Sequence, residues 1–156
     1  MPVKAQTQRT INAPQEAVWA VLDDFPAIAG WSAGIQKSYT TGTTDLATGV
    51  GAERRCELGG NKILDERISA YTPGQSMTVD VWNIEGLPLK SSQTTFSVHT
   101  TGPGTSEARI QAEVTPKAPG FIVKLAGPLM AKGIAKNFSG LLDELAQEAE
   151  RKAANS

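Results

Sequence analysis

Residues 120–152 carry the longest helical pattern of the chain, and this pattern limits how the remaining residues can fold. One apolar face of this segment recurs at helical spacing and consists of Phe138, Leu141, Leu142, Leu145 and Ala149. Pro128 lies inside the pattern, where its missing backbone donor is expected to kink or restart the helix. Gly127, Gly133 and Gly140 each lower helix stability by roughly 1 kcal/mol relative to alanine. Such a helix either packs loosely on a sheet or leaves room for another molecule.

The segment 50–116 has the pattern of four or five strands separated by short turns rich in glycine and proline. Strands joined by short turns pair antiparallel, because a parallel neighbour needs a long crossover. The last strand alternates cleanly, with Ser106, Ala108, Ile110, Ala112 and Val114 on its apolar side. A further strand is expected over residues 3–11, followed by short helical segments. The sequence therefore predicts an α+β fold in which a curved antiparallel sheet grips one long C-terminal helix.

Composition excludes several classes of function. The 156 residues suit a single domain, 1–156, and the net charge of −1 gives no reason to expect a nucleic-acid partner. We expect no integral membrane association and a cytoplasmic location, because no apolar run is long enough to span a bilayer and no signal segment is recognisable. One cysteine and one histidine argue against a disulfide and a zinc site, and we expect no metal and no other cofactor.

Two charged residues fall on the apolar side of neighbouring strands. If residues 59–61 form a three-residue turn, Leu58 faces Lys62 and Arg54 lies opposite Glu66, with both charges pointing into the concave side of the sheet. A charge in an apolar interior is costly unless it is paired or hydrated. The pair is therefore either a salt bridge that fixes strand register or a polar handle for a ligand. A turn of different length would point one of the two outward.

The remaining candidates are weaker. His99 has the register of the solvent-facing side, which indicates a surface histidine, and Cys56 has the inward register of a small buried thiol. Aromatic residues on an inner face either fill the core or line a pocket. Those considered for a pocket are Trp31, Tyr71, Trp82, Phe96 and Phe138.

Several short motifs occur in an order that resembles a known family. They are Ala13-Pro14 with Val18-Trp19, Gly49-x-Gly51-x-x-Arg54, Leu64-Asp65-Glu66-Arg67-Ile68 and Tyr71-x-Pro73-Gly74. The order and spacing resemble the polyketide cyclase/dehydrase and lipid-transport group of the START-like superfamily, also called SRPBCC, which includes the birch pollen allergen. The resemblance implies a helix-grip fold with seven antiparallel strands and two short helices after strand 1. It also implies a cavity for an apolar small molecule between sheet and helix.

Three functions remain open on this basis. The first is noncatalytic binding or transport of a hydrophobic small molecule, a lipid or polyketide-like compound, by a monomer or a homodimer. The second is a cyclase or aromatase with Glu66 as general base and Arg54 stabilising an enolate. The third is a module that docks a protein at the loop 86–89 and the rim of the pocket. The expected ligand-binding residues are Trp31, Arg54, Glu66, Trp82, Phe96, Phe138 and Leu141.

Overall fold

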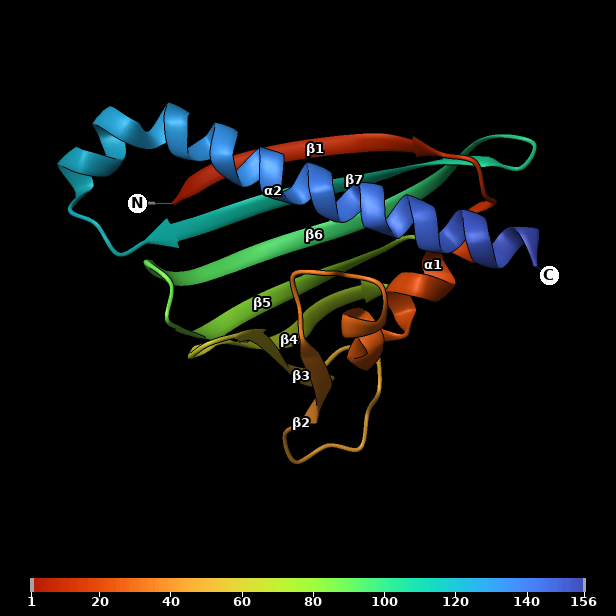
Figure 1. The fold of residues 1–156 in the computed structure, drawn as a ribbon, viewed down its shortest axis with the longest axis horizontal. Helices are drawn as coiled ribbons and strands as arrows, with labels where there is room; N and C mark the ends of the chain where they lie inside the picture. Colours follow the sequence, from red (N-terminus) through yellow and green to blue (C-terminus); the bar gives the residue numbers. More distant parts are fainter. Residues whose placement is uncertain (1, 156) are drawn as a thin grey trace.

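The computed structural model describes residues 2–155 and consists of seven strands, two α-helices and one 3-10 helix (Figure 1). In chain order the elements are β1 (Val3–Ile11), α1 (Gln15–Asp23), η1 (Phe25–Gly30), β2 (Lys37–Thr41), β3 (Glu53–Gly59), β4 (Lys62–Thr72), β5 (Ser76–Glu85), β6 (Leu89–Gly102), β7 (Thr105–Pro116) and α2 (Gly120–Ala154). The two short helices after β1 agree with the expected arrangement.

All seven strands form one antiparallel sheet in the order β1-β7-β6-β5-β4-β3-β2. Consecutive strands from β2 to β7 are direct neighbours because tight turns join most of them. The turn between β6 and β7, for example, places Gly104 at φ 68°, a conformation that side-chain-bearing residues rarely adopt. The sheet curves, and α2 runs along its concave side (Figure 1). The predicted α+β helix-grip fold is confirmed.

The alternation predicted for β7 is also confirmed. Ser106, Ala108, Ile110, Ala112 and Val114 are all buried, whereas the residues between them are more exposed. Ser106 is a polar residue on this apolar side, and its hydroxyl donates a 2.9 Å hydrogen bond to the carbonyl of Ala13. The inner face of β7 is therefore apolar, and its one polar side chain, Ser106, has a hydrogen-bond partner.

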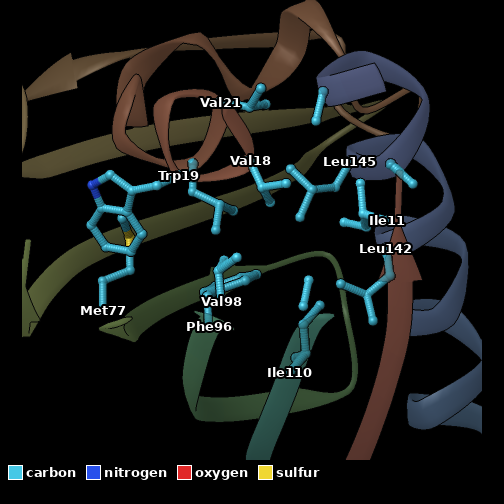
Figure 2. Packing of buried hydrophobic residues seen from close by; sticks show 14 of the residues in the cluster. Ile11, Val18, Trp19, Val21, Met77, Phe96, Val98, Ile110, Leu142 and Leu145 are labelled. Atoms are coloured by element: carbon cyan, nitrogen blue, oxygen red, sulfur yellow. The ribbon is translucent and has the colours of Figure 1, made fainter. Parts of the chain in front are cut away.

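The core lies at the end of the sheet where α1 meets the C-terminal half of α2. Side chains from α1 and α2 meet those of the strands in Figure 2, with Val18 and Leu145 facing Val98 and Ile110. Leu142 and Leu145 are each 1% exposed, so truncating either to alanine should cost about 2–5 kcal/mol.

The two halves of α2 are held very differently. Its C-terminal half buries Leu142, Leu145, Ala146 and Ala149, whereas Val123 is the one fully buried residue of its N-terminal half, residues 120–137. Polar contacts follow the same division: Asp143 pairs with Arg9, Glu144 accepts from the Ala33 amide at 2.6 Å, and Glu150 accepts from the Asn12 amide at 2.9 Å. Pro128 does not end the helix, which continues through it. The C-terminal half of α2 thus has most of the buried residues of the helix and these side-chain contacts to the rest of the fold.

Candidate functional site

Arg54 and Glu66 form the buried pair that the sequence predicted. They are directly opposite on β3 and β4, and 5% and 6% of their surfaces are exposed. Arg54 Nε and Nη2 both donate to Glu66 Oε2, at 3.0 and 2.6 Å. Two charge-assisted bonds to one carboxylate oxygen hold the pair in a fixed geometry.

The turn that sets this register differs from the expected one. Gly59 pairs with Lys62, so the turn consists of Gly60 and Asn61 and the expected pairing of Leu58 with Lys62 is wrong. The register shifts by one residue between Glu57 and Gly59, and Leu58 is the extra residue of a β-bulge. The bulge compensates for the shorter turn, which is why Arg54 still lies opposite Glu66.

The pair also connects the sheet to η1. Arg54 Nη1 donates to the carbonyl of Phe25 at 2.7 Å, and the guanidinium lies over the Phe25 ring, 3.8 Å from its centroid. The space beside Arg54 has a volume of only about 10 Å³, which is about enough for one water molecule. The arrangement is that of a structural salt bridge that anchors η1, and the expected ligand cavity at this position is too small for an organic molecule.

The other expected site residues are divided among three places. Trp31 and Phe96 line the same small space beside Arg54, and Phe138 and Leu141 are partly buried against the core. The placement of Trp82 in the interior is corrected: 46% of it is exposed on the outer face, with the Arg67 guanidinium 5.3 Å from its ring centroid. The physical reason is strand alternation: Met77, Val79 and Val81 are buried, so Trp82, the next residue, lies on the opposite side of β5.

The two nucleophile or base candidates have the positions expected of them. His99 is exposed and lies 3.8 Å from Glu107 on the outer face of the sheet. Cys56 is fully buried, and this burial raises the pKa of its thiol to about 12, with the nearby Glu66 carboxylate adding to the effect. The thiol is therefore protonated at neutral pH and is a poor nucleophile.

An apolar groove of about 690 Å³ lies at the opposite end of the concave side, under the N-terminal half of α2. Its volume is within the range of small-molecule sites in proteins. The residues that line it come from the ends of β1 and β7, the loop between β5 and β6, and α2; they are Val3, Leu87, Pro88, Leu89, Val114, Pro116, Lys117, Ala118, Met130, Gly133, Ile134, Lys136 and Asn137. We call this the apolar groove.

The groove exists because the helix above it makes little contact with the sheet. Gly133 lines the groove and has no side chain, and a Cβ atom built on it would have no other atom within 4 Å. Met130 and Ile134 line the groove one turn apart, and their spacing continues the helical face that Phe138 and Leu141 form further along. The helical periodicity thus continues through the groove, while the tight packing stops near Leu141.

The polar groups of the groove are few. Lys117 and Lys136 are its two charged residues and Asn137 contributes an amide. None of the expected site residues lines it, and sequence reasoning missed Met130, Ile134 and the lysines. The glycines of α2 were the one signal in the sequence that pointed to this region. Leu87 and Leu89 of the loop 86–89 line the groove.

Other features are less suited to an apolar ligand. Hollows of about 450 and 420 Å³ on the outer face of the sheet are lined largely by polar residues such as Gln93 and Glu113. Across residues 2–155, no cluster of three or more His, Cys, Asp or Glu side chains is arranged to hold a metal ion. Within the same range, no helix combines the length and the apolar composition needed to cross a membrane.

Known structures share this fold. A START superfamily protein from Mycobacterium smegmatis has 14% identity and a TM-score of 0.78, with 96% of this chain and 98% of that chain covered. An aromatase/cyclase, Zhui, from Streptomyces sp. R1128 has 15% identity and a TM-score of 0.78, with 97% and 96% covered. The protein Ara h 8.0201 has 12% identity and a TM-score of 0.69, with 97% and 99% covered. At these identities the likeness establishes the fold alone.

Sequence comparisons add the family. No curated protein matches the chain. The family model described as polyketide cyclase / dehydrase and lipid transport matches residues 2–150, nearly the whole chain. The resemblance noted in the short motifs is thereby confirmed, and the chain belongs to the polyketide cyclase/dehydrase and lipid-transport family.

Proposed function

We propose that this protein binds an apolar or amphipathic small molecule, a lipid or polyketide-like compound, in the apolar groove under the N-terminal half of α2. The observation that carries the proposal is a 690 Å³ hollow with mostly apolar walls on the concave side of a helix-grip fold. Each methylene group moved from water into such a site contributes about 0.8 kcal/mol. Micromolar affinity corresponds to about −8.2 kcal/mol, so about ten buried methylene groups would supply it, and about five more would offset an entropic cost of about 4 kcal/mol.

The charged residues of the groove suggest which way the ligand lies. Lys117 and Lys136 form no ion pair with any residue in 2–155, so their ammonium groups are free to pair with an anionic ligand head. Met130, Ile134 and, further along the same helical face, Phe138 would contact the apolar tail. A fatty-acid-like molecule with a carboxylate or phosphate head matches this distribution of charge and apolar surface.

The second candidate, a cyclase, has less support from the geometry. Glu66 and Arg54 are bonded to each other beside a space that holds about one water molecule. The apolar groove is lined by no carboxylate and no histidine among the described residues, so it offers no evident general base. We therefore favour binding without catalysis. A substrate turnover that Glu66→Gln abolishes in a folded protein would reverse this preference.

The test is direct ligand binding. The protein is exposed to a lipid extract, separated from free lipid and examined by native mass spectrometry, and it is titrated in parallel with the fluorescent fatty acid cis-parinaric acid. We expect a retained apolar ligand and saturable binding at one site. The absence of a retained ligand over a broad panel, together with no saturable fluorescence change, would refute the proposal.

A further inference from the structure

The outer side of the N-terminal half of α2 exposes large apolar residues to solvent. Phe121, Leu125 and Leu129 are 68%, 82% and 75% exposed. Together with Lys132 and Lys136 they follow one another at steps of four, four, three and four residues, so all five lie on one side of the helix. We call these five residues the basic apolar stripe. Exposed apolar residues that gather on one face mark a surface that a membrane or another molecule covers.

The charge around this stripe has a single sign. Residues 114–142 contain four lysines and no Asp or Glu, although the whole chain has a net charge of −1. Lys117, Lys124, Lys132 and Lys136 form no ion pair within the described residues 2–155. Four uncompensated positive charges next to exposed leucine and phenylalanine match a surface that is both apolar and negatively charged.

We propose that the basic apolar stripe docks on an anionic lipid surface, with the axis of the N-terminal half of α2 lying near the plane of the headgroups. Phe121, Leu125 and Leu129 would enter the boundary between headgroups and acyl chains, and Lys132 and Lys136 would remain among the anionic headgroups. Each lysine near an anionic leaflet strengthens binding by a factor on the order of five, and each buried leucine by a factor on the order of ten.

This docking would bring the apolar groove to the lipid. Lys136 belongs to both the stripe and the groove lining, and Leu129 of the stripe is followed directly by Met130 of the groove. A ligand could then pass between bilayer and groove without crossing water. The docking does not depend on the proposed function, however, because the stripe is exposed whether or not the groove is occupied.

A second copy of the chain matches the stripe less well. In a two-fold dimer the stripe would lie on itself and bring lysines of both copies together. The acidic residues of the C-terminal half of α2 are not free to neutralise them, because Asp143 pairs with Arg9, Glu144 accepts from Ala33, and Glu148 pairs with Arg151. An anionic bilayer supplies both the negative charge that neutralises the lysines and an apolar interior that buries the apolar side chains.

The test uses vesicle co-sedimentation of the whole chain at low ionic strength. Vesicles of phosphatidylcholine alone are compared with vesicles of phosphatidylcholine and phosphatidylglycerol in a two-to-one ratio. We expect binding to the second kind. The partition constant should fall roughly twenty-five-fold in Lys124→Gln/Lys132→Gln, which removes one lysine of the stripe and the neighbouring Lys124, and roughly a hundredfold in Leu125→Ser/Leu129→Ser. None of these four positions lines the apolar groove, so cis-parinaric acid binding in the absence of vesicles should not change.

Matched controls lie elsewhere on the surface. Lys62→Gln/Lys90→Gln removes two exposed lysines from the sheet, and Leu46→Ser/Val50→Ser removes two exposed apolar residues from a loop. Both should bind vesicles like the original chain. The proposal is overturned if the original chain does not bind anionic vesicles, or if the control variants lose as much vesicle binding as Lys124→Gln/Lys132→Gln and Leu125→Ser/Leu129→Ser. It is overturned equally if sedimentation shows a dimer that Leu125→Ser/Leu129→Ser dissociates, because a second copy would then cover the stripe.

Discussion

Replacing Gly133 by leucine should separate helix stability from ligand binding. Gly133 is exposed in the middle of α2 and lines the apolar groove, and a Cβ atom there would meet no other atom within 4 Å. Leucine is the better helix former by roughly 0.5–1 kcal/mol. For a chain of this size that gain should raise the melting temperature by about 1–4 °C.

The same leucine would occupy part of the groove. If its carbons displace about three methylene groups of a bound ligand, the lost burial is roughly 2.4 kcal/mol, or about sixtyfold in the dissociation constant. Gly133→Leu should therefore melt at a higher temperature and bind cis-parinaric acid far more weakly. Gly133→Ala should retain the gain in stability and lose much less affinity, because a methyl group displaces little ligand.

Gly140 supplies the matched control. It lies in the same helix, a Cβ atom there also meets nothing within 4 Å, and it does not line the groove. Gly140→Leu should stabilise the helix similarly and leave ligand binding unchanged. Equal losses of affinity in both leucine variants would mean that helix flexibility, and not groove volume, controls binding. Unchanged affinity in Gly133→Leu would show that the ligand binds elsewhere.

Three further predictions concern the buried polar groups. Glu66→Leu alone should lower the free energy of unfolding by about 3–5 kcal/mol in urea titration, because Arg54 is left buried and unpaired. The double variant Arg54→Met/Glu66→Leu should lose much less stability. Equal losses in the two variants would exclude a buried pair. Because burial raises the pKa of Cys56 to about 12, only the unfolded state loses the thiol proton between about pH 9 and 12, and the free energy of unfolding should decline over this range. Cys56→Ala should remove this decline. An unchanged alkaline profile in that variant would contradict the prediction. The Arg55 guanidinium lowers the pKa of Asp65, so the contribution of ionised Asp65 to the free energy of unfolding should be complete above about pH 4 and be lost as the pH falls through the lower native pKa. The stability of Asp65→Asn should lack this acid-dependent loss. Identical acid profiles of the two proteins would refute the prediction.

The parts of the fold that follow from alternation were predictable from the sequence. The inward residues of β7, the opposite placement of Arg54 and Glu66, and the buried Cys56 all depend on period-two patterns within single strands. Trp82 was misplaced because it was selected as an aromatic residue, although the period-two pattern of Met77, Val79 and Val81 puts it on the outer face. The β-bulge at Leu58 could not be predicted, because no residue type marks the extra position, but it compensates for the error in turn length.

The candidate site was harder to predict for a different reason. Helical periodicity identifies which side chains face the sheet, and Met130 and Ile134 continue the pattern of Phe138 and Leu141. Periodicity contains no information on how far the helix stands from the sheet at each turn. That distance depends on the side chains opposite, which come from β1, β7 and the loop 86–89 and are remote in the sequence. The residues expected to bind a ligand therefore lie outside the lining of the groove.

The one-sided attachment of α2 has a consequence for how this protein can change over evolution. The buried residues of α2 are concentrated around Leu142, Leu145 and Ala149, whereas those that line the hollow lie one to three turns before Leu142. Mutations of the exposed residues in 120–137 can therefore alter the size and chemistry of the hollow at little thermodynamic cost to the scaffold. A fold built on this plan can change its hollow while its architecture is retained.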